Sequence, residues 1–511
     1  RMFLKAGLLS LLLLLASRVL GVLRETALAA AFGSSGMADV AIVMLTLPDW
    51  LAGVLVSGAL AYVLLPHWAQ ESAAQQNATQ NLVARRLLWG SLVMAGLMYA
   101  AQGPVAALLV PGASATLQGA ASNAVVWSAL ALPAAMLAGL WATRLQHERD
   151  FVGLYSANLV VNGVLIASLL LLGSLGVGPG AVQTLGVFLL VAVGLRLLWQ
   201  GWRMRCLRHN VLPVASPSVP PPPLPGWRIW MWAALGAGLP LTLPFAARTF
   251  ASGAGEGALA TFNYAWKLVE LPLILAIQLV ASLAFPAIAR AHAASASDTG
   301  HTSADAMAMA VRNALVLAWT LACAAAAALL VGAPVIASLL FGWGRMDVPA
   351  LEQIAAWGRV GAWGLLPQAL LAVALTVLAS VGSMRFAVLA YVLALALLLA
   401  VGAAGWTAGE SLMWGLNAGF AVAALIAGGA LGAPALRHWL PIRALLAPSL
   451  ALAVVALLAH WWGGAGAAAA GLVRDLGPKQ ALSIVGIVFS ATFVIASAWL
   501  SGPGLRQALR S

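Results

Sequence analysis

Apolar stretches alternate with short polar segments along the entire chain. An α-helix needs about 20 consecutive apolar residues to cross the hydrocarbon core of a bilayer, and runs of this length recur from end to end. The pattern therefore predicts an all-α polytopic membrane protein with about fourteen transmembrane helices. The expected spans are 4–23, 38–66, 84–110, 122–143, 152–173, 181–201, 227–249, 258–289, 310–333, 351–380, 384–404, 410–431, 443–463 and 481–501.

The segments between these spans alternate in charge. One set is rich in arginine, whereas the other includes 111–121 and 174–180, which have no charged residue. Because Lys and Arg accumulate in cytoplasmic loops, we expect the arginine-rich set and both termini in the cytoplasm. This needs an even number of spans, which fourteen satisfies and twelve would too. The arginines are Arg85, Arg86, Arg144, Arg149, Arg203, Arg205, Arg208, Arg228, Arg290, Arg312, Arg385, Arg437, Arg443, Arg506 and Arg510.

Composition agrees with a membrane protein, since 63% of the 511 residues are hydrophobic and 8% are charged. A net charge of +12 then reflects cytoplasmic loops, and no basic run with interleaved aromatic residues indicates a nucleic-acid partner. Cys206 and Cys323 suggest neither a disulfide framework nor a metal site. The sequence contains no phosphate-binding loop and no catalytic motif. We therefore predict a transporter without cofactor, coupled to the membrane potential or to a monovalent cation, and not an enzyme.

A proline-rich segment at 203–226 divides the chain into two halves that look related. A shift of 224 positions brings Arg24 onto Arg248 and Pro48 onto Pro272. Internal repeats of six spans are one layout of secondary transporters, with the substrate site between the repeats. The expected organisation is an N-terminal lobe, a cytoplasmic linker, a C-terminal lobe and two final helices that line a lipid groove. Their boundaries are 1–202, 203–226, 227–432 and 433–511.

Two arginines lie within the first span, and charges in a bilayer are rare and usually functional. Arg18 and Arg24 are six residues apart, or about 9 Å and 120° on a helix. Guanidinium groups bind phosphate or carboxylate oxygens in a forked geometry, so we interpret both as an anion site. The alternative for Arg24 is a residue at the outer end of the span that pairs with Glu25.

Three further charged residues complete the candidate substrate-binding set: Asp39, Lys267 and Glu270. Asp39 opens the second span, where it is either a substrate-binding residue or the N-cap of that helix. Lys267 and Glu270 are three residues apart in the eighth span and can form an ion pair. We favour a second reading for Lys267, as a cationic contact that faces Arg18 across a central cavity.

The stretch SRVLGVLRETALAAAFGSSGMADVAIVMLTLPDWLAGVLVSGALAYVLLPHWAQ, residues 17–70, resembles the start of MurJ (MviN) proteins. Residues 132–162 and 264–290 continue the resemblance, which covers the whole chain. These flippases move lipid II, an undecaprenyl-diphosphate-linked peptidoglycan precursor, and belong to the superfamily of the MATE exporters. The resemblance implies fourteen helices, of which the last two line a lipid-facing groove. It also implies roles in flipping for Arg18, Arg24 and Asp39, with Lys267 where the family has an arginine.

The chain departs from the family at several positions that are usually charged: Ala52, Gly53, Ser57 and Trp266. The resemblance implies a lipid II flippase that works by alternating access in the bacterial cytoplasmic membrane. The alternatives are a flippase for another polyprenyl-linked oligosaccharide, such as an exopolysaccharide or O-antigen unit, and a MATE-like drug antiporter coupled to cations. A third alternative is a membrane scaffold. Expected partners are the polyprenyl-diphosphate-linked glycolipid, membrane lipids and cell-envelope synthesis enzymes.

Overall fold

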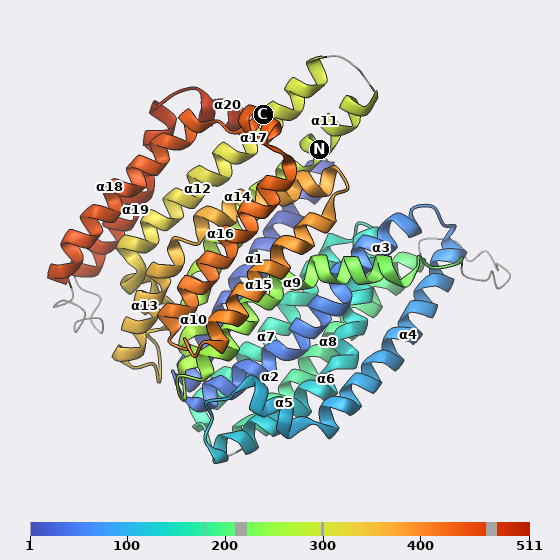
Figure 1. The fold of residues 1–511 in the computed structure, drawn as a ribbon. Coiled ribbons are helices and arrows are strands. Elements are labelled where there is room, and N and C mark those ends of the chain that lie inside the picture. Colours follow the sequence, from blue (N-terminus) through green and yellow to red (C-terminus); the bar gives the residue numbers. More distant parts are fainter. Residues whose placement is uncertain (1, 179, 210–221, 298–300, 467–477, 511) are drawn as a thin grey trace. The chain divides into compact units, whose positions relative to one another are not determined.

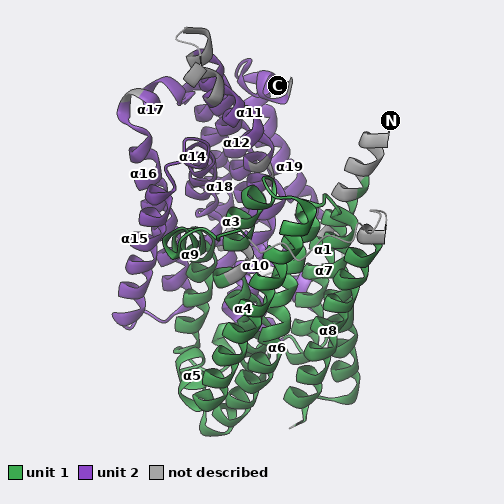
Figure 2. Ribbon diagram, turned by 90° about the vertical axis from the view of Figure 1, so that its right-hand side faces the viewer, with its two compact units in different colours: residues 1–260, 343–346 green, residues 261–342, 347–511 purple. Residues whose placement is uncertain are grey.

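The computed structural model describes residues 2–178, 180–209, 222–297, 301–466 and 478–510, and every regular element within these ranges is a helix (Figure 1). The all-α polytopic fold predicted from the apolar pattern is thereby confirmed. The chain forms two compact units, which Figure 2 distinguishes by colour. Unit 1 comprises Arg1–Ala260 and Trp343–Met346, and unit 2 comprises Thr261–Gly342 and Asp347–Ser511.

In the described residues, unit 1 is built from nine helices, one π-helical turn (η1) and the first residues of a tenth helix. Helix α1 packs along α7, both α2 and α8 pack on α6, and α9 packs on α3. The elements are α1 (Met2–Phe32), α2 (Gly36–Ala52), η1 (Gly53–Ser57), α3 (Gly58–Trp68), α4 (Ala73–Ala100), α5 (Gln102–Leu109), α6 (Ala115–His147), α7 (Phe151–Leu175), α8 (Ala181–His209), α9 (Trp227–Ser252) and the start of α10 (Ala258–Pro272).

Unit 2 is organised around α12, a helix of 41 residues that packs against α11, α13, α18 and α19. Helix α16 packs on both α14 and α15. Besides the rest of α10, the elements are η2 (Leu273–Ile277), α11 (Gln278–Ser297), α12 (His301–Phe341), α13 (Val348–Ala362), α14 (Leu365–Ser380), α15 (Met384–Ala403), α16 (Gly409–Leu431), α17 (Ala433–Trp439), α18 (Ile442–Gly466), α19 (Pro478–Leu500) and α20 (Gly504–Arg510).

Several helices begin at a polar residue whose side chain accepts a backbone N–H of the first turn. Ser35 caps α2, Asp150 caps α7 and Asp347 caps α13. Ser72 forms a reciprocal capping box with Gln75 at the start of α4. Such caps satisfy donors that a helix cannot pair internally, so short polar segments help to define where these four helices start.

The two π-helical turns both follow a Leu-Pro pair inside a long helical run. Pro48 lies five residues before η1, and Pro272 directly precedes η2. Proline has no backbone N–H to donate and disturbs the regular helical pattern around it. The helices therefore depart from ideal geometry in these two runs. Single π turns of this kind occur frequently at functional sites.

Within the described residues, eleven helices are long and apolar enough to cross a membrane, or up to twelve if each bent pair is one span. Helices α13 and α14 form that pair, with a bend of 48°. This number is lower than the fourteen that the sequence predicts. Helix α1 and the α10–η2–α11 run are not among the eleven, although they occupy the ranges of the predicted first and eighth spans.

The predicted linker at 203–226 begins inside a helix, because α8 continues to His209. Residues 210–221 of this segment lie outside the described residues. Helix α9, which follows the linker, packs on α3 and belongs to unit 1. The compact units are defined by packing, whereas the predicted lobes rest on a sequence repeat. The units therefore do not test the lobe boundaries, which stay a prediction.

Candidate functional site

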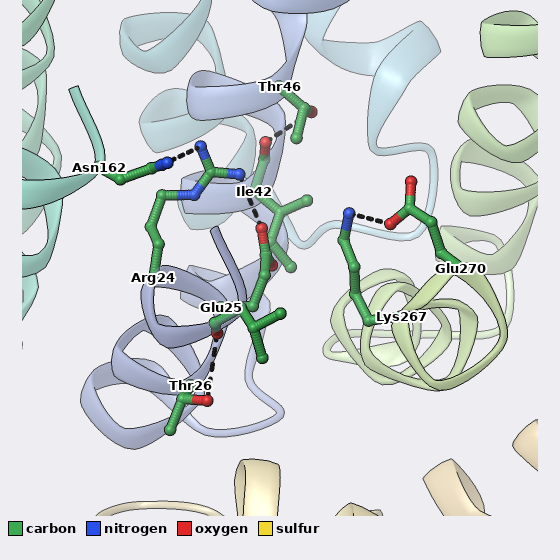
Figure 3. A network of polar contacts seen from close by, with 9 residues as sticks. Arg24, Glu25, Thr26, Ile42, Thr46, Asn162, Lys267 and Glu270 are labelled. Atoms are coloured by element: carbon green, nitrogen blue, oxygen red, sulfur yellow. Dashed lines mark hydrogen bonds and ion pairs between the residues drawn. The ribbon is translucent and has the colours of Figure 1, made fainter. Parts of the chain in front are cut away.

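Arg24 is held on α1 by two polar partners. Its Nη2 donates to Glu25 Oε1 at 2.9 Å, and its Nη1 donates to Asn162 Oδ1 at 3.4 Å (Figure 3). Asn162 comes from α7, the helix that packs along α1. Glu25 is buried, with 6% of its surface exposed. The pairing with Glu25, which belonged to the alternative interpretation of Arg24, is present, but α1 continues to Phe32, so Arg24 lies inside the helix and not at its end.

Arg18 is in a different situation, although it lies on the same helix. Its side chain is exposed, and within the described part of the chain it makes no hydrogen bond or ion pair. The two arginines therefore do not share partners in the described residues. Helix α1 presents one guanidinium that is anchored and one that is available to an anionic ligand.

Lys267 and Glu270 of α10 form the ion pair that their spacing predicts (Figure 3). Both side chains are about a quarter exposed. The neighbouring Trp266 is buried and stacks on Phe420 of α16, with ring centroids 6.1 Å apart. Trp266 thus belongs to the packing of unit 2, while Lys267 and Glu270 keep access to the surface of that unit.

Asp39 caps the N-terminus of α10 with its side chain, although it lies on another helix. Ser35 caps α2, whereas the Asp39 carboxylate accepts the backbone N–H groups of Gly257 and Ala260 at the start of α10, both at 2.7 Å. The alternative that Asp39 caps the second span is therefore wrong. Asp39 is 1% exposed, and a carboxylate at a helix N-terminus is stabilised by the free N–H groups and the helix dipole. The sequence could not reveal a partner more than 200 residues away.

The segment that Asp39 caps is also fixed by a glycine. Gly257 has φ +84°, and a Cβ at this position would lie 2.4 Å from the backbone oxygen of Ser34. The Ser34 hydroxyl in turn donates to the Gly257 carbonyl at 3.1 Å. The turn between α1 and α2 and the turn between α9 and α10 are thus joined by hydrogen bonds on both sides of Gly257. This arrangement gives Asp39 a structural role that the sequence does not indicate.

Sequence reasoning overlooked two polar residues of α8, Arg196 and Gln200, and one of α7, Asn162. Arg196 interrupts the apolar run GVFLLVAVGLRLLW, which is a recognisable signal because charges inside spans are rare. Asn162 lies in an otherwise apolar stretch and carries a weaker signal. Its role becomes visible only when α7 packs against α1 and brings it to Arg24.

Comparison with known proteins shows to which family the chain belongs. The sequence pattern of the family described as "Lipid II flippase MurJ" matches residues 28–462, most of the chain. The chain belongs to the MurJ family. This family consists of transporters and not enzymes, it implies a lipid-linked precursor as substrate, and it confirms a multi-pass membrane protein. A comparison with curated protein sequences gives no match.

Solved structures of MurJ and MATE transporters have the same fold. A "Lipid II flippase MurJ, inward closed conformation" superposes with a TM-score of 0.76 at 13% identity, covering 96% of this chain and 98% of that chain. An inward-facing multidrug resistance MATE transporter gives 0.59 at 15% identity over 80% and 92%. A MOP superfamily transporter from Pyrococcus furiosus gives 0.55 at 16% over 83% and 94%. At these identities the structures demonstrate the fold alone.

The family match covers only some of the candidate residues of this MurJ family member. Asp39, Lys267 and Glu270 lie within the matched range, whereas Arg18 and Arg24 precede it. The two arginines are therefore candidates because of their chemistry and position on α1.

Proposed function

We propose that this MurJ family protein moves a polyprenyl-diphosphate-linked glycolipid of the lipid II type from the inner to the outer leaflet of the bacterial cytoplasmic membrane by alternating access. Membership of the family over residues 28–462 supports the class of substrate. The observation that carries the proposal is the exposed guanidinium of Arg18, which has no partner in the described part of the chain. An unpaired cation within an apolar helix is costly unless a ligand or water neutralises it.

A diphosphate fits this site on α1. A guanidinium donates two parallel hydrogen bonds to phosphate oxygens and stays charged at any physiological pH. Arg24, oriented by Glu25 and Asn162, supplies a second cation on the same helix. We infer that Arg18 binds the diphosphate directly, whereas Arg24, whose charge is offset by Glu25, is a fixed donor on the same helix.

Lys267 and Glu270 remain candidate substrate contacts of unit 2. The ammonium of Lys267 lacks the fork of an arginine and is already paired with Glu270. Binding of an anionic headgroup by Lys267 would therefore compete with this pair. The variant Lys267→Arg separates the two roles, because it keeps the charge and adds forked donors.

The membrane potential favours one direction of substrate transport. Moving one charge through a potential of 100 mV is worth about 2.3 kcal/mol, so an inside-negative potential favours outward movement of an anionic headgroup. The same potential would draw a bound monovalent cation inward during the return step. A MATE-like exporter of cationic drugs is less well supported, because Asp39, Glu25 and Glu270 are all engaged by partners of this chain.

Complementation tests the proposal. A bacterium depleted of its own lipid II flippase would express the chain, Arg18→Ala, and the matched control Arg85→Ala, which removes an exposed arginine of α4. We expect growth with the chain and with the control but not with Arg18→Ala, at equal amounts of protein in the membrane. Growth with all three would remove Arg18 from the mechanism. No growth with the native chain would favour another polyprenyl-linked oligosaccharide, a reading that the uncharged Ala52, Gly53 and Ser57 already suggest.

A further inference from the structure

Helix α8 of unit 1 carries two polar residues whose hydrogen-bonding groups are buried without partners. Arg196 and Gln200 are four residues apart and therefore lie on the same face of the helix. Gln200 is 0% exposed, and both its amide oxygen and its amide nitrogen lack hydrogen bonds within the described residues. The Nε of Arg196 is also buried and has no partner there.

Three such atoms on one face of a helix call for a physical explanation. Most buried polar atoms are paired, since an unpaired donor or acceptor has lost its bonds to water without replacement. Gln200 could bond to the carbonyl oxygen one turn earlier, as Gln368 of α14 does with Gly364, but it does not. These groups of α8 can therefore serve as donors and as an acceptor for a ligand from outside the chain.

The electrostatics of this face indicate what that ligand is. Asp49 of α2 interacts electrostatically with the Arg196 guanidinium, although the two groups form no ion pair. Helices α2 and α8 pack on each other, the Asp49 side chain is exposed and Arg196 is partly exposed, so the polar face is accessible at Arg196, whereas Gln200, one turn along, is enclosed by the fold. Asp49 offsets the charge of Arg196, in contrast to the exposed and unpaired Arg18. A nearly neutral set of donors and acceptors suits hydroxyl and acetamido groups better than a diphosphate.

We propose that Arg196 and Gln200, with Asp49 nearby, bind the sugar part of the lipid-linked headgroup through hydrogen bonds. The inference rests on the proposed function and adds a second subsite within unit 1, distinct from the diphosphate contact at Arg18. The two subsites divide recognition, since one binds the charged diphosphate common to all polyprenyl diphosphates and the other binds the sugar part of the headgroup.

Binding to the purified full chain in lipid nanodiscs tests this division with two ligands. Lipid II carries diphosphate and sugar, whereas undecaprenyl diphosphate carries diphosphate alone. We expect Arg196→Met and Gln200→Met each to weaken lipid II binding about tenfold, or about 1.4 kcal/mol, and to leave undecaprenyl diphosphate binding unchanged. Arg18→Ala should weaken both. The matched control Gln368→Met replaces a buried glutamine that is already paired and should change neither affinity.

Thermal stability separates a binding role from a structural one. Replacing an unpaired buried polar group by an apolar side chain of similar size is neutral or stabilising, so Gln200→Met should melt at the same temperature or higher. Arg196→Lys keeps the charge without Nε and provides a second test if a methionine variant does not fold. Equal weakening of both ligands, or no weakening of lipid II, would overturn the sugar subsite. If the native chain bound neither ligand, the proposed function would fail with it.

Discussion

Asp39 provides the sharpest test of the described structure, because its carboxylate caps α10 from a distant point of the chain. Asp39→Ala leaves the N–H groups of Gly257 and Ala260 buried without an acceptor. Each unpaired group costs about 1–3 kcal/mol, and the lost interaction with the helix dipole adds about 0.3–1 kcal/mol. We expect the start of α10 to be destabilised by about 3 kcal/mol, since such contributions are not fully additive.

Hydrogen exchange measures this loss locally, which suits a large membrane protein without a simple two-state unfolding transition. A loss of about 3 kcal/mol corresponds to exchange roughly a hundredfold faster at these amides, because 1.4 kcal/mol is a factor of ten. Peptides covering 255–264 should show the change in Asp39→Ala. Asp39→Asn keeps one acceptor oxygen and should show a smaller one.

Ser35→Ala is the matched control for Asp39→Ala. Ser35 caps α2 by accepting the Ala38 N–H at 3.2 Å, so its loss should cost about 1 kcal/mol and affect only the start of α2. Exchange over 255–264 should stay unchanged in this variant. Unchanged exchange there in Asp39→Ala as well would refute the cap and the reasoning built on it.

Substitutions at three further positions test other contacts. Gly257→Ala forces a Cβ toward the Ser34 oxygen at a positive φ, so we expect at least about 2 kcal/mol of destabilisation and a low yield of folded protein in detergent. Arg203→Lys breaks the two-pronged contact with Asp150, whose N–O distances are 2.7 and 2.9 Å. We expect the free energy of opening at the start of α7 to fall by about 1 kcal/mol, and faster hydrogen exchange there would confirm it. Lys267→Ala should lower transport while Lys267→Arg keeps it, and a leaflet-exposure assay with fluorescent lipid II in liposomes would decide this.

The predictions that succeeded depend on residues close together in the sequence. The ion pair of Lys267 with Glu270 follows from their spacing on one helix, and Glu25 is adjacent to Arg24. Helical spans follow from apolar runs because the lipid environment requires every backbone polar group to be paired within its own segment. Local geometry is enough for such contacts.

Long-range contacts could not be predicted in this way. Arg24 meets Asn162 only because α1 packs on α7, and Asp39 in the first turn of α2 meets the start of α10. The N-cap alternative for Asp39 was wrong for a local reason, since nearby Ser35 already fills that position. In an alanine- and leucine-rich chain, many pairs of helices satisfy the same apolar pattern, and the pattern alone does not select among them.

The sequence by itself determined the membrane environment, the helical class, the family resemblance and the presence of cations within the first span. Tertiary packing decided which of these polar groups have partners. It pairs Arg24 with Asn162 and Asp39 with α10, and leaves Arg18 and Gln200 without protein partners in the described residues. The physical reason is that hydrophobicity and helical periodicity are properties of a segment, whereas the pairing of a buried polar group depends on the atoms that other segments bring to it.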